Sequence, residues 1–272
     1  MTDLFRTRDH VPDFDGYIAS YKERSAHTRA RLPCKLDVPY GNGADERLDL
    51  FFPAGRLNGA PVHLFVHGGY WRMFEKGDFS FVADTVTASG AIAAVIDYSL
   101  MPSARMETIV RQVYLAFHWL TINAERFGGD GARVSVSGHS AGAHLCALLL
   151  KDAHPIQPLS SLLISGIYDL APLRHSFLQP ELALTDREVQ LFSPLRLPIR
   201  PQGRVVLAVG SRETEPFHVQ ARQLGSSINV RVTPIPDGDH MKVALDLGDP
   251  ESVPGKALAA ICLEQAQPGL CH

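Results

Sequence analysis

The sequence predicts an α/β fold in which helices cover both faces of a mostly parallel, eight-stranded sheet. Three observations favour it. Short runs rich in β-branched residues alternate with helical patterns along the chain. Most of these runs are continuously apolar, as in strands buried on both faces. A serine flanked by glycines follows one of the runs directly. With 272 residues and 45% hydrophobic composition, the chain is long enough for one large core, so we expect a single domain over residues 1–272.

The chain begins with a helical pattern and a hairpin. Residues 14–31 predict a mostly polar helix, so residues 1–31 form an N-terminal helical segment. Residues 35–39 and 47–52 predict two strands, separated by the turn signal Gly41-Asn42-Gly43. We expect these strands to pair as an antiparallel edge of the sheet.

Strands and helices then alternate. The remaining strands are expected at residues 62–66, 92–96, 134–137, 162–164, 205–209 and 230–233. Between them lie helical segments with apolar stripes, at 109–120, 141–149, 219–224 and 257–263. This alternation predicts parallel strands joined by right-handed crossovers.

Residues 171–200 break the alternation. They contain four prolines and no strong period, and they follow the sixth predicted strand. An insertion of this length is often a lid over a site, so we expect a short lid here. The alternative is a surface excursion without a catalytic role.

Composition narrows the function classes. The net charge is −3, and the basic residues of segment 22–31 are mixed with polar ones, so we expect no nucleic-acid partner. No apolar run is long enough to span a membrane, and the first residues lack a signal-peptide core. The four cysteines have no metal-ligand spacing. We therefore expect a cytoplasmic protein that needs no metal or cofactor.

The segment Gly138-His139-Ser140-Ala141-Gly142 matches the G-x-S-x-G pattern. It follows a predicted strand and opens a predicted helix, the context in which this pattern holds a nucleophilic serine on a tight turn. The glycines leave room for that turn, and the helix start directs free N–H groups to a developing oxyanion. We predict Ser140 as the nucleophile.

A second motif, His67-Gly68-Gly69-Tyr70-Trp71, follows the first buried-type strand. Acyl transfer needs donors aimed at the carbonyl oxygen as it becomes negative, and glycines let backbone N–H groups face the site. We predict the N–H groups of Gly69, Tyr70 and Ala141 as the oxyanion hole. His67 and Gly68 are expected to support the loop, His67 by hydrogen bonding.

The base and the acid should come later in the chain, in the order nucleophile, acid, histidine. His240 follows the last predicted strand and is the expected base, whereas His139, His144 and His218 are competitors judged to face elsewhere or to be structural. For the acid, Glu213 follows the strand at 205–209. Glu215 and, more distantly, Asp169 remain alternatives, and Asp237 and Asp239 fit turn positions.

With these motifs in place, the chain resembles the kynurenine formamidase (arylformamidase) group of the α/β-hydrolases. The resemblance covers most of the chain, and its most specific motif is His67 to Trp71. It rests on residues 37–41, 46–49, 67–71, 138–144 and 168–173, and on Glu213 with Phe217-His218. The resemblance implies the α/β-hydrolase fold and cleavage of an aryl formamide such as N-formylkynurenine, with release of formate. The acid position is aspartate in the animal enzymes and glutamate here.

Several aspects of substrate binding stay open at this stage. Trp71, Phe74, Tyr98 and His139 are expected pocket residues, because sites form beyond the carboxyl ends of parallel strands. The alternative is that the aromatic residues pack the early loops. The same machinery would hydrolyse short-chain esters, and a hydrolase-fold binding protein without catalysis is a third reading. We expect a small-molecule ester or amide as partner, no membrane, and a possible homodimer.

Overall fold

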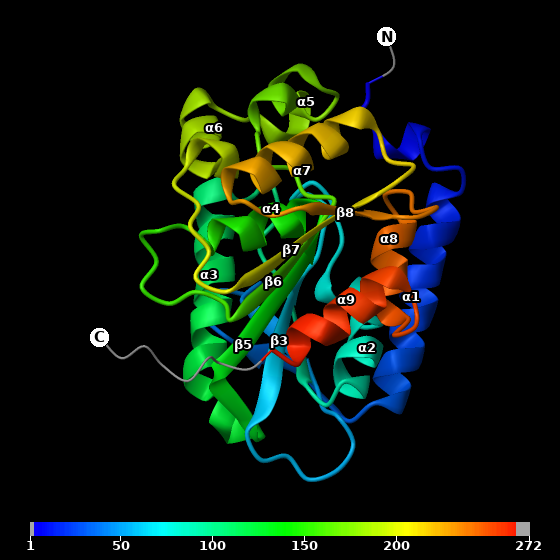
Figure 1. Ribbon diagram of the computed structural model, residues 1–272, viewed down its shortest axis with the longest axis vertical. Coiled ribbons are helices and arrows are strands. Elements are labelled where there is room, and N and C mark those ends of the chain that lie inside the picture. Colours follow the sequence, from blue (N-terminus) through cyan, green and yellow to red (C-terminus); the bar gives the residue numbers. More distant parts are fainter. Residues whose placement is uncertain (1–2, 265–272) are drawn as a thin grey trace.

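The computed structural model describes residues 3–264, which form one mixed sheet wrapped by helices (Figure 1). Its strands are β1 (Cys34–Pro39), β2 (Arg47–Phe51), β3 (Ala60–Val66), β4 (Ile92–Ile96), β5 (Gly129–His139), β6 (Ser160–Ile164), β7 (Arg204–Gly210) and β8 (Val232–Ile235). Their order is β1-β2-β4-β3-β5-β6-β7-β8. β2 is antiparallel to β1 and β4, whereas the pairs from β4 to β8 are parallel. The predicted fold class and its antiparallel edge are confirmed.

Helices cover both faces of this sheet (Figure 1). They are α1 (Phe14–Arg31), α2 (Val82–Ala88), α3 (Met106–Asn123), α4 (Ala141–Leu148), α5 (Gln179–Leu182), α6 (Asp186–Phe192), α7 (Glu215–Ser227), α8 (Lys242–Leu245) and α9 (Val253–Cys262). α3, α4 and α7 lie on one face, and α1, α2, α8 and α9 on the other.

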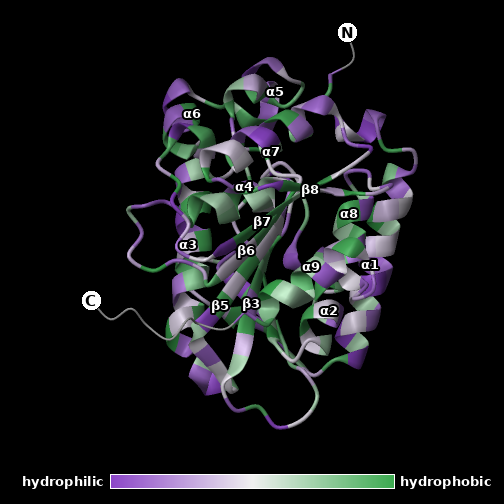
Figure 2. Cartoon of the chain, in the orientation of Figure 1, coloured by the Kyte–Doolittle hydropathy of each residue, from purple (hydrophilic) through white to green (hydrophobic). Residues whose placement is uncertain are grey.

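Two hydrophobic cores result, one on each face. Because side chains alternate along a strand, Leu64 and Val66 of β3 join the core beneath α3 and α4, and Phe65 joins the core beneath α2 and α9. All three side chains are at most 1% exposed. Figure 2 shows hydrophobic residues concentrated along the central strands and hydrophilic residues on the outer helices. Burial on both faces explains the continuously apolar runs in the sequence.

Element boundaries differ from the sequence prediction at the C-terminal end. β8 spans Val232–Ile235, two residues later than expected, and α7 and α9 are longer than expected. Each of these two helices has a proline in its first turn, Pro216 and Pro254, where the missing N–H costs nothing. Apolar periodicity alone detects only the buried part of such a helix.

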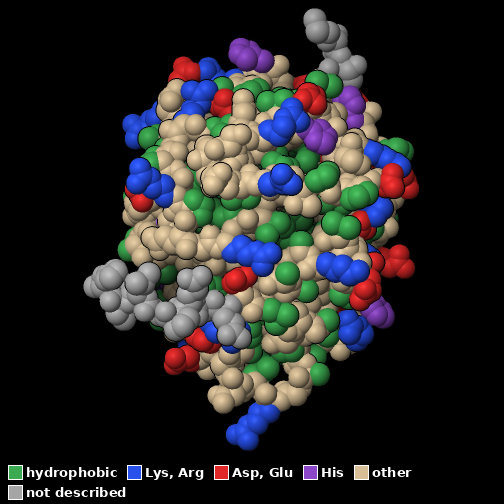
Figure 3. All heavy atoms as spheres, viewed as in Figure 1, with side chains coloured by type: hydrophobic (Ala, Val, Ile, Leu, Met, Phe, Trp, Pro, Cys, Tyr) green, Lys and Arg blue, Asp and Glu red, His purple; other side chains and the backbone are tan. Residues whose placement is uncertain are grey.

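The insertion at 171–200 folds into short helical pieces, among them α5 and α6, beside α7 (Figure 1). At the other end of the chain, a short 3-10 helix, Thr7–Asp9, leads into α1. On the face shown in Figure 3, basic and acidic side chains are interspersed rather than gathered by sign. Within residues 3–264, no helix is long and apolar enough to cross a membrane.

Candidate active site

Ser140 sits on a strained turn between β5 and α4. Its backbone has φ 56° and ψ −117°, a region that non-glycine residues rarely occupy. The flanking glycines are required by close approach. A Cβ at Gly142 would lie 1.9 Å from the carbonyl oxygen of Val66, and one at Gly138 would lie 2.4 Å from the Gly142 carbonyl group. The turn therefore exists only because both positions lack a side chain.

Ser140, His240 and Glu213 form a hydrogen-bonded chain. His240 Nε2 lies 3.0 Å from Ser140 Oγ, and His240 Nδ1 lies 2.6 Å from Glu213 Oε2. The side chains of His240 and Glu213 are 7% and 0% exposed. These contacts place a base next to the serine hydroxyl and a carboxylate behind the base, the arrangement of a Ser-His-acid triad.

Two hydrogen bonds to the other carboxylate oxygen, Oε1, hold Glu213 in place. Oε1 accepts hydrogen bonds from the Gly210 N–H, at 2.8 Å, and from the hydroxyl of Ser165. Ser165 is fully buried, follows β6 directly and has φ 54°. Sequence reasoning did not find this residue, although its place at the carboxyl end of a parallel strand is a signal for it. Ser165 and Gly210 fix the direction in which Glu213 faces His240.

The other acid candidates point elsewhere. Glu215 starts α7 and pairs with Arg222 on the surface, 2.7 Å away. Asp169 pairs with Arg196 at 3.1 Å. Asp239 accepts from the N–H groups of Met241 and Lys242, which makes it a turn residue as expected. The structure thus brings only Glu213 of these carboxylates to the histidine.

His240 is enclosed by two rings, those of Phe217 at 4.4 Å and His139 at 4.7 Å between centroids. We expected the side chain of His139 to face away from the serine, and this is wrong, because it lies against His240 and lines the catalytic cavity. Burial, followed by the nearby His240, lowers the pKa of His139 well below its usual value. A neutral His139 adds no second positive charge beside the base. The side chain of His144 accordingly lies elsewhere, against Trp71 and the Phe192 carbonyl.

The loop after β3 presents free backbone donors to the serine. Gly69 and Tyr70 have φ of 103° and 50°, and both residues line the cavity beside Ser140. Among the described residues, the N–H groups of Gly69, Tyr70 and Ala141 have no hydrogen-bond acceptor. Free N–H groups close to a nucleophile are the donor type that an oxyanion hole requires, and the assignment of these three residues to that role stays a prediction.

His67 supports this loop from below. Its Nδ1 lies 2.8 Å from the carbonyl oxygen of Gly68, and its ring stacks on that of Tyr98 with centroids 4.4 Å apart. The Tyr98 hydroxyl donates to the His67 carbonyl oxygen at 2.9 Å. Burial lowers the pKa of His67, so the ring is uncharged in this packing.

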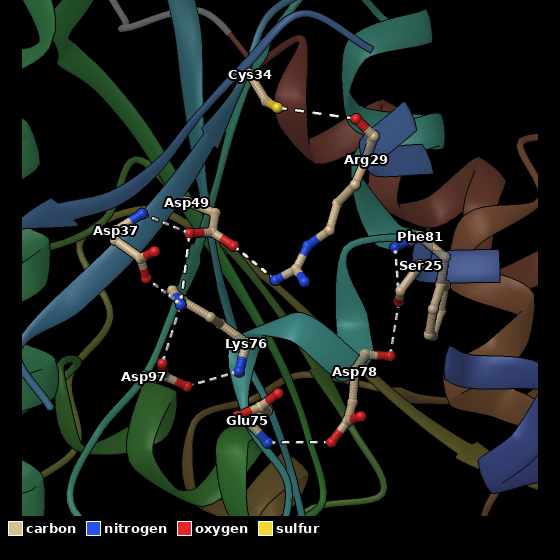
Figure 4. Close-up of polar contacts among 10 residues, drawn as sticks. All are labelled: Ser25, Arg29, Cys34, Asp37, Asp49, Glu75, Lys76, Asp78, Phe81 and Asp97. Carbon is tan, nitrogen blue, oxygen red and sulfur yellow. Dashed lines mark hydrogen bonds and ion pairs between the residues drawn. The ribbon is translucent and has the colours of Figure 1, made fainter. Parts of the chain in front are cut away.

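Lys76 anchors the far end of the same loop to the sheet edge (Figure 4). Its Nζ lies 2.8 Å from Asp37, 3.3 Å from Asp97 and 3.5 Å from Asp49. Arg29 of α1 also binds Asp49, at 2.9 Å. Burial opposes the charge of Lys76, but the Asp37 hydrogen bond and the other carboxylates outweigh it and raise the lysine pKa. Asp37 and Asp49, which belong to the motifs of the resemblance, therefore act on the loop rather than on substrate.

A small cavity of about 20 Å³ lies beside Ser140. Its walls come from the N-terminal segment, the oxyanion loop and the triad. They are Thr7, Phe14, Tyr21, Gly69, Tyr70, Met73, Phe74, Phe79, His139, Ser140, His240 and Met241. This volume holds one water molecule or a group of similar size.

Two expected pocket residues and the expected lid are corrected. Trp71 and Tyr98 are 0% and 2% exposed and do not line the cavity; they pack beneath the loop, whereas Phe74 and His139 do line it. No residue of 171–200 lines it either, and this segment packs on the outer side of the loop, where Phe177 meets Tyr70. The cover comes instead from residues 3–21.

This N-terminal cover is tied to the site by hydrogen bonds. The Tyr70 hydroxyl donates to the carbonyl oxygen of Phe5, and the Thr214 hydroxyl donates to that of Leu4 at 2.7 Å. Phe5 also packs on Phe217, which touches His240. A polar helix and its leading turn gave no sequence signal for such a role, because the contacts that tie them to the site are with residues distant in the chain.

With this geometry established, comparison with known proteins gives the family. The model of an α/β-hydrolase fold family matches residues 63–212, which include the oxyanion loop, the serine turn and the strand before Glu213. The chain belongs to the α/β-hydrolase fold family.

Individual relatives and a solved structure show which kinds of hydrolase the chain resembles. The chain is 28% identical to a kynurenine formamidase of Salmo salar and 25% identical to one of Danio rerio, each over 86% of this chain and 83% of the relative. A crystal structure of a candidate thioesterase from Silicibacter sp. TM1040 superposes with a TM-score of 0.85 at 26% identity, covering 96% of this chain and 98% of that one. The expected resemblance to kynurenine formamidases is confirmed. Family and relatives together indicate a hydrolase of amide or ester bonds.

Proposed function

We propose that this α/β-hydrolase is a serine hydrolase that cleaves an aryl formamide such as N-formylkynurenine. The observation that carries the proposal is the cavity of about 20 Å³ that Ser140, His240, Gly69 and Tyr70 line together. A formyl group is the smallest acyl group and suits so small a space. The similarity to two kynurenine formamidases over 86% of the chain supports the same substrate class.

In the first half of the reaction, Ser140 Oγ attacks the formyl carbon and its proton passes to His240 Nε2. Glu213 holds the imidazole and stabilises its charged form. The carbonyl oxygen becomes negative and accepts hydrogen bonds from Gly69, Tyr70 and Ala141. The tetrahedral intermediate then collapses, the C–N bond breaks, and His240 donates its proton to the departing aryl amine.

The second half releases the acyl group. Water attacks the formyl ester on Ser140 while His240 accepts one of its protons. Collapse of the second tetrahedral intermediate returns that proton to Ser140 Oγ and frees formate. Both halves of the reaction use the same three side chains, the three backbone N–H groups and water.

Hydrolysis of short-chain esters is the second candidate, favoured by the same triad geometry, because a Ser-His-acid triad attacks ester and amide carbonyls alike. A comparison of N-formylkynurenine with p-nitrophenyl formate, acetate, butyrate and octanoate separates the two. The proposal expects the highest kcat/KM for the formamide and a steep fall with acyl length among the esters. A preference for butyrate or octanoate would overturn it.

The alternative, that this chain is a hydrolase-fold binding protein without catalysis, is tested by replacing the nucleophile. Ser140→Ala should lower kcat/KM at least about 10³-fold and abolish labelling by a fluorophosphonate, with an unchanged melting temperature. His218→Ala, on α7, is the control and should retain both activities. Wild-type turnover in Ser140→Ala would exclude the mechanism.

A further inference from the structure

The catalytic cavity has an open neighbour. A cleft of about 560 Å³ lies between α1 and the segment that follows the oxyanion loop. It is lined by Lys22, Ala26, Arg29, Phe74, Glu75, Gly77 and Asp78. Phe74 is shared by the linings of the cleft and of the catalytic cavity. The two spaces are therefore neighbours that meet at the Phe74 side chain.

Phe74 lies where the two spaces meet. Its φ is 74°, and its half-buried ring packs against Phe79 and Tyr21, with centroids 5.5 and 6.3 Å away. A Cβ built at Gly69 would lie 2.8 Å from Phe74 Cδ2, so the ring touches the oxyanion loop itself. A cavity of about 20 Å³ holds the acyl group alone. The rest of an aryl substrate must lie outside this cavity, and the cleft is a neighbouring space that shares Phe74 with it.

The cleft beyond Phe74 carries opposite charges on its two sides. On α1, Lys22 is exposed and has no hydrogen bond or ion pair among residues 3–264. Arg29 follows seven residues later on the same helix face. Glu75 and Asp78 stand on the opposite side, where Asp78 Oδ2 accepts from the Glu75 N–H at 3.2 Å.

Of the two cations, Lys22 is the one available to a ligand. The Arg29 guanidinium turns toward Asp49 and lies against Gly77, where a Cβ would meet it at 2.8 Å (Figure 4). It is thus committed to the loop anchor. Lys22 has no such partner and can approach a carboxylate freely, while the carboxylates of Glu75 and Asp78 offer acceptors for a cation.

We propose that this cleft is the subsite for the leaving-group end of the substrate, and that Lys22 is its specificity-determining residue for the amino-acid group of N-formylkynurenine. The carboxylate of this group would face Lys22, and its ammonium would face Glu75 and Asp78. The inference rests on the proposed function and adds the place and chemistry of a subsite that recognises the leaving group. A neutral or purely cationic leaving group fits the cleft less well, because Lys22 then stays unpaired.

A pair of substrates that differ in one carboxylate tests the proposal. N-formylkynurenine carries the amino-acid group, and N-formylkynuramine is the same compound without the carboxylate. For Lys22→Ala, we expect KM for N-formylkynurenine to rise about tenfold with kcat kept, and both constants for N-formylkynuramine to stay unchanged. Lys35→Ala removes the same exposed charge near Phe127, outside the cleft, and should leave both substrates unaffected. An equal effect of Lys22→Ala on both substrates, or no effect, would overturn the subsite.

A binding measurement separates this proposal from the reaction. Kynurenine titrated into Ser140→Ala should bind about tenfold more tightly than into Ser140→Ala/Lys22→Ala. If esters are hydrolysed but neither formamide is, the proposed function fails, and the titration still judges the cleft. Kynurenine binding that depends on Lys22 supports the subsite, and binding that is absent or independent of Lys22 refutes it.

Discussion

Two clusters of charged side chains hold the site, and they differ in what they leave unpaired. In the catalytic cluster, Ser165 and Glu213 direct His240, and the chain of hydrogen bonds ends at a serine hydroxyl that faces a cavity. In the anchor cluster, Lys76 lies within 4 Å of three carboxylates. None of these carboxylates lines the cavity beside Ser140. The first cluster positions a proton, and the second positions a loop.

The comparison teaches that activity and stability are carried by different residues here. Changes in the catalytic cluster should lower turnover with little effect on folding. Changes in the anchor cluster should lower stability and reach turnover only through the loop. Substitutions in each cluster test whether activity and stability separate in this way, and the largest effect is expected in the catalytic cluster.

Glu213→Gln should lower kcat about 10²- to 10⁴-fold, because an amide neither stabilises a charged His240 nor fixes its tautomer. The measurement is steady-state hydrolysis of p-nitrophenyl acetate and N-formylkynurenine, with a thermal melt in parallel. Glu215→Gln is the matched control, since Glu215 pairs with Arg222 on the surface, and it should stay within about twofold of wild type. A larger loss from Glu215→Gln than from Glu213→Gln would refute the assignment of the acid.

Lys76→Met should cost about 2–3 kcal/mol of unfolding free energy. It leaves Asp37, Asp49 and Asp97 without their shared cation, and the lysine side chain is only 12% exposed. Urea unfolding at neutral pH measures the change, and Lys35→Met, at an exposed site, should be nearly neutral. If the variant kept full stability but lost activity, the anchor would belong to the catalytic cluster and the division would be wrong.

Ser165→Ala should lower kcat about tenfold with KM unchanged, because Glu213 then loses one of the two hydrogen bonds to Oε1. Ser165→Cys, which keeps a weaker donor without a β-branch at φ 54°, should recover part of the loss. A purely structural role would instead lower the melting temperature and leave kcat of the folded protein intact.

His63 belongs to neither cluster and supplies a pH test of the core. Its ring lies between Ser135 and Ser137, and burial lowers its pKa to about 3. The unfolded chain therefore binds the extra proton first, so the stability from a neutral His63 is present above pH 6.5 and is lost as pH falls toward 3.

From pH 7.5 to pH 5.5 the loss from this one group is about 1.4 kcal/mol. Urea unfolding of His63→Gln should show a pH dependence smaller by that amount than in wild type, while the pH profile of kcat stays the same. An identical pH dependence of stability in the two proteins would contradict the assignment.

Local sequence motifs predicted the nucleophile, the loop before it and the fold class. The turn at Ser140 needs glycine at positions 138 and 142, and the positive φ of Gly69 follows from the same steric rule. The positive φ of Tyr70 goes against that rule and is imposed by the packing around the loop. The fold class followed from strand runs buried on both faces. Such features depend on neighbours close in the chain, and the sequence displays those neighbours directly.

Tertiary structure alone decided what depends on distant segments. It selected Glu213 over Glu215, added Ser165 from another strand, and moved Trp71 from the pocket wall into the core. It also replaced the expected lid at 171–200 with the N-terminal cover, and placed Phe74 between two spaces. Cavities and carboxylate orientations are set by the packing of elements far apart in the chain, and no local pattern of residues records that packing.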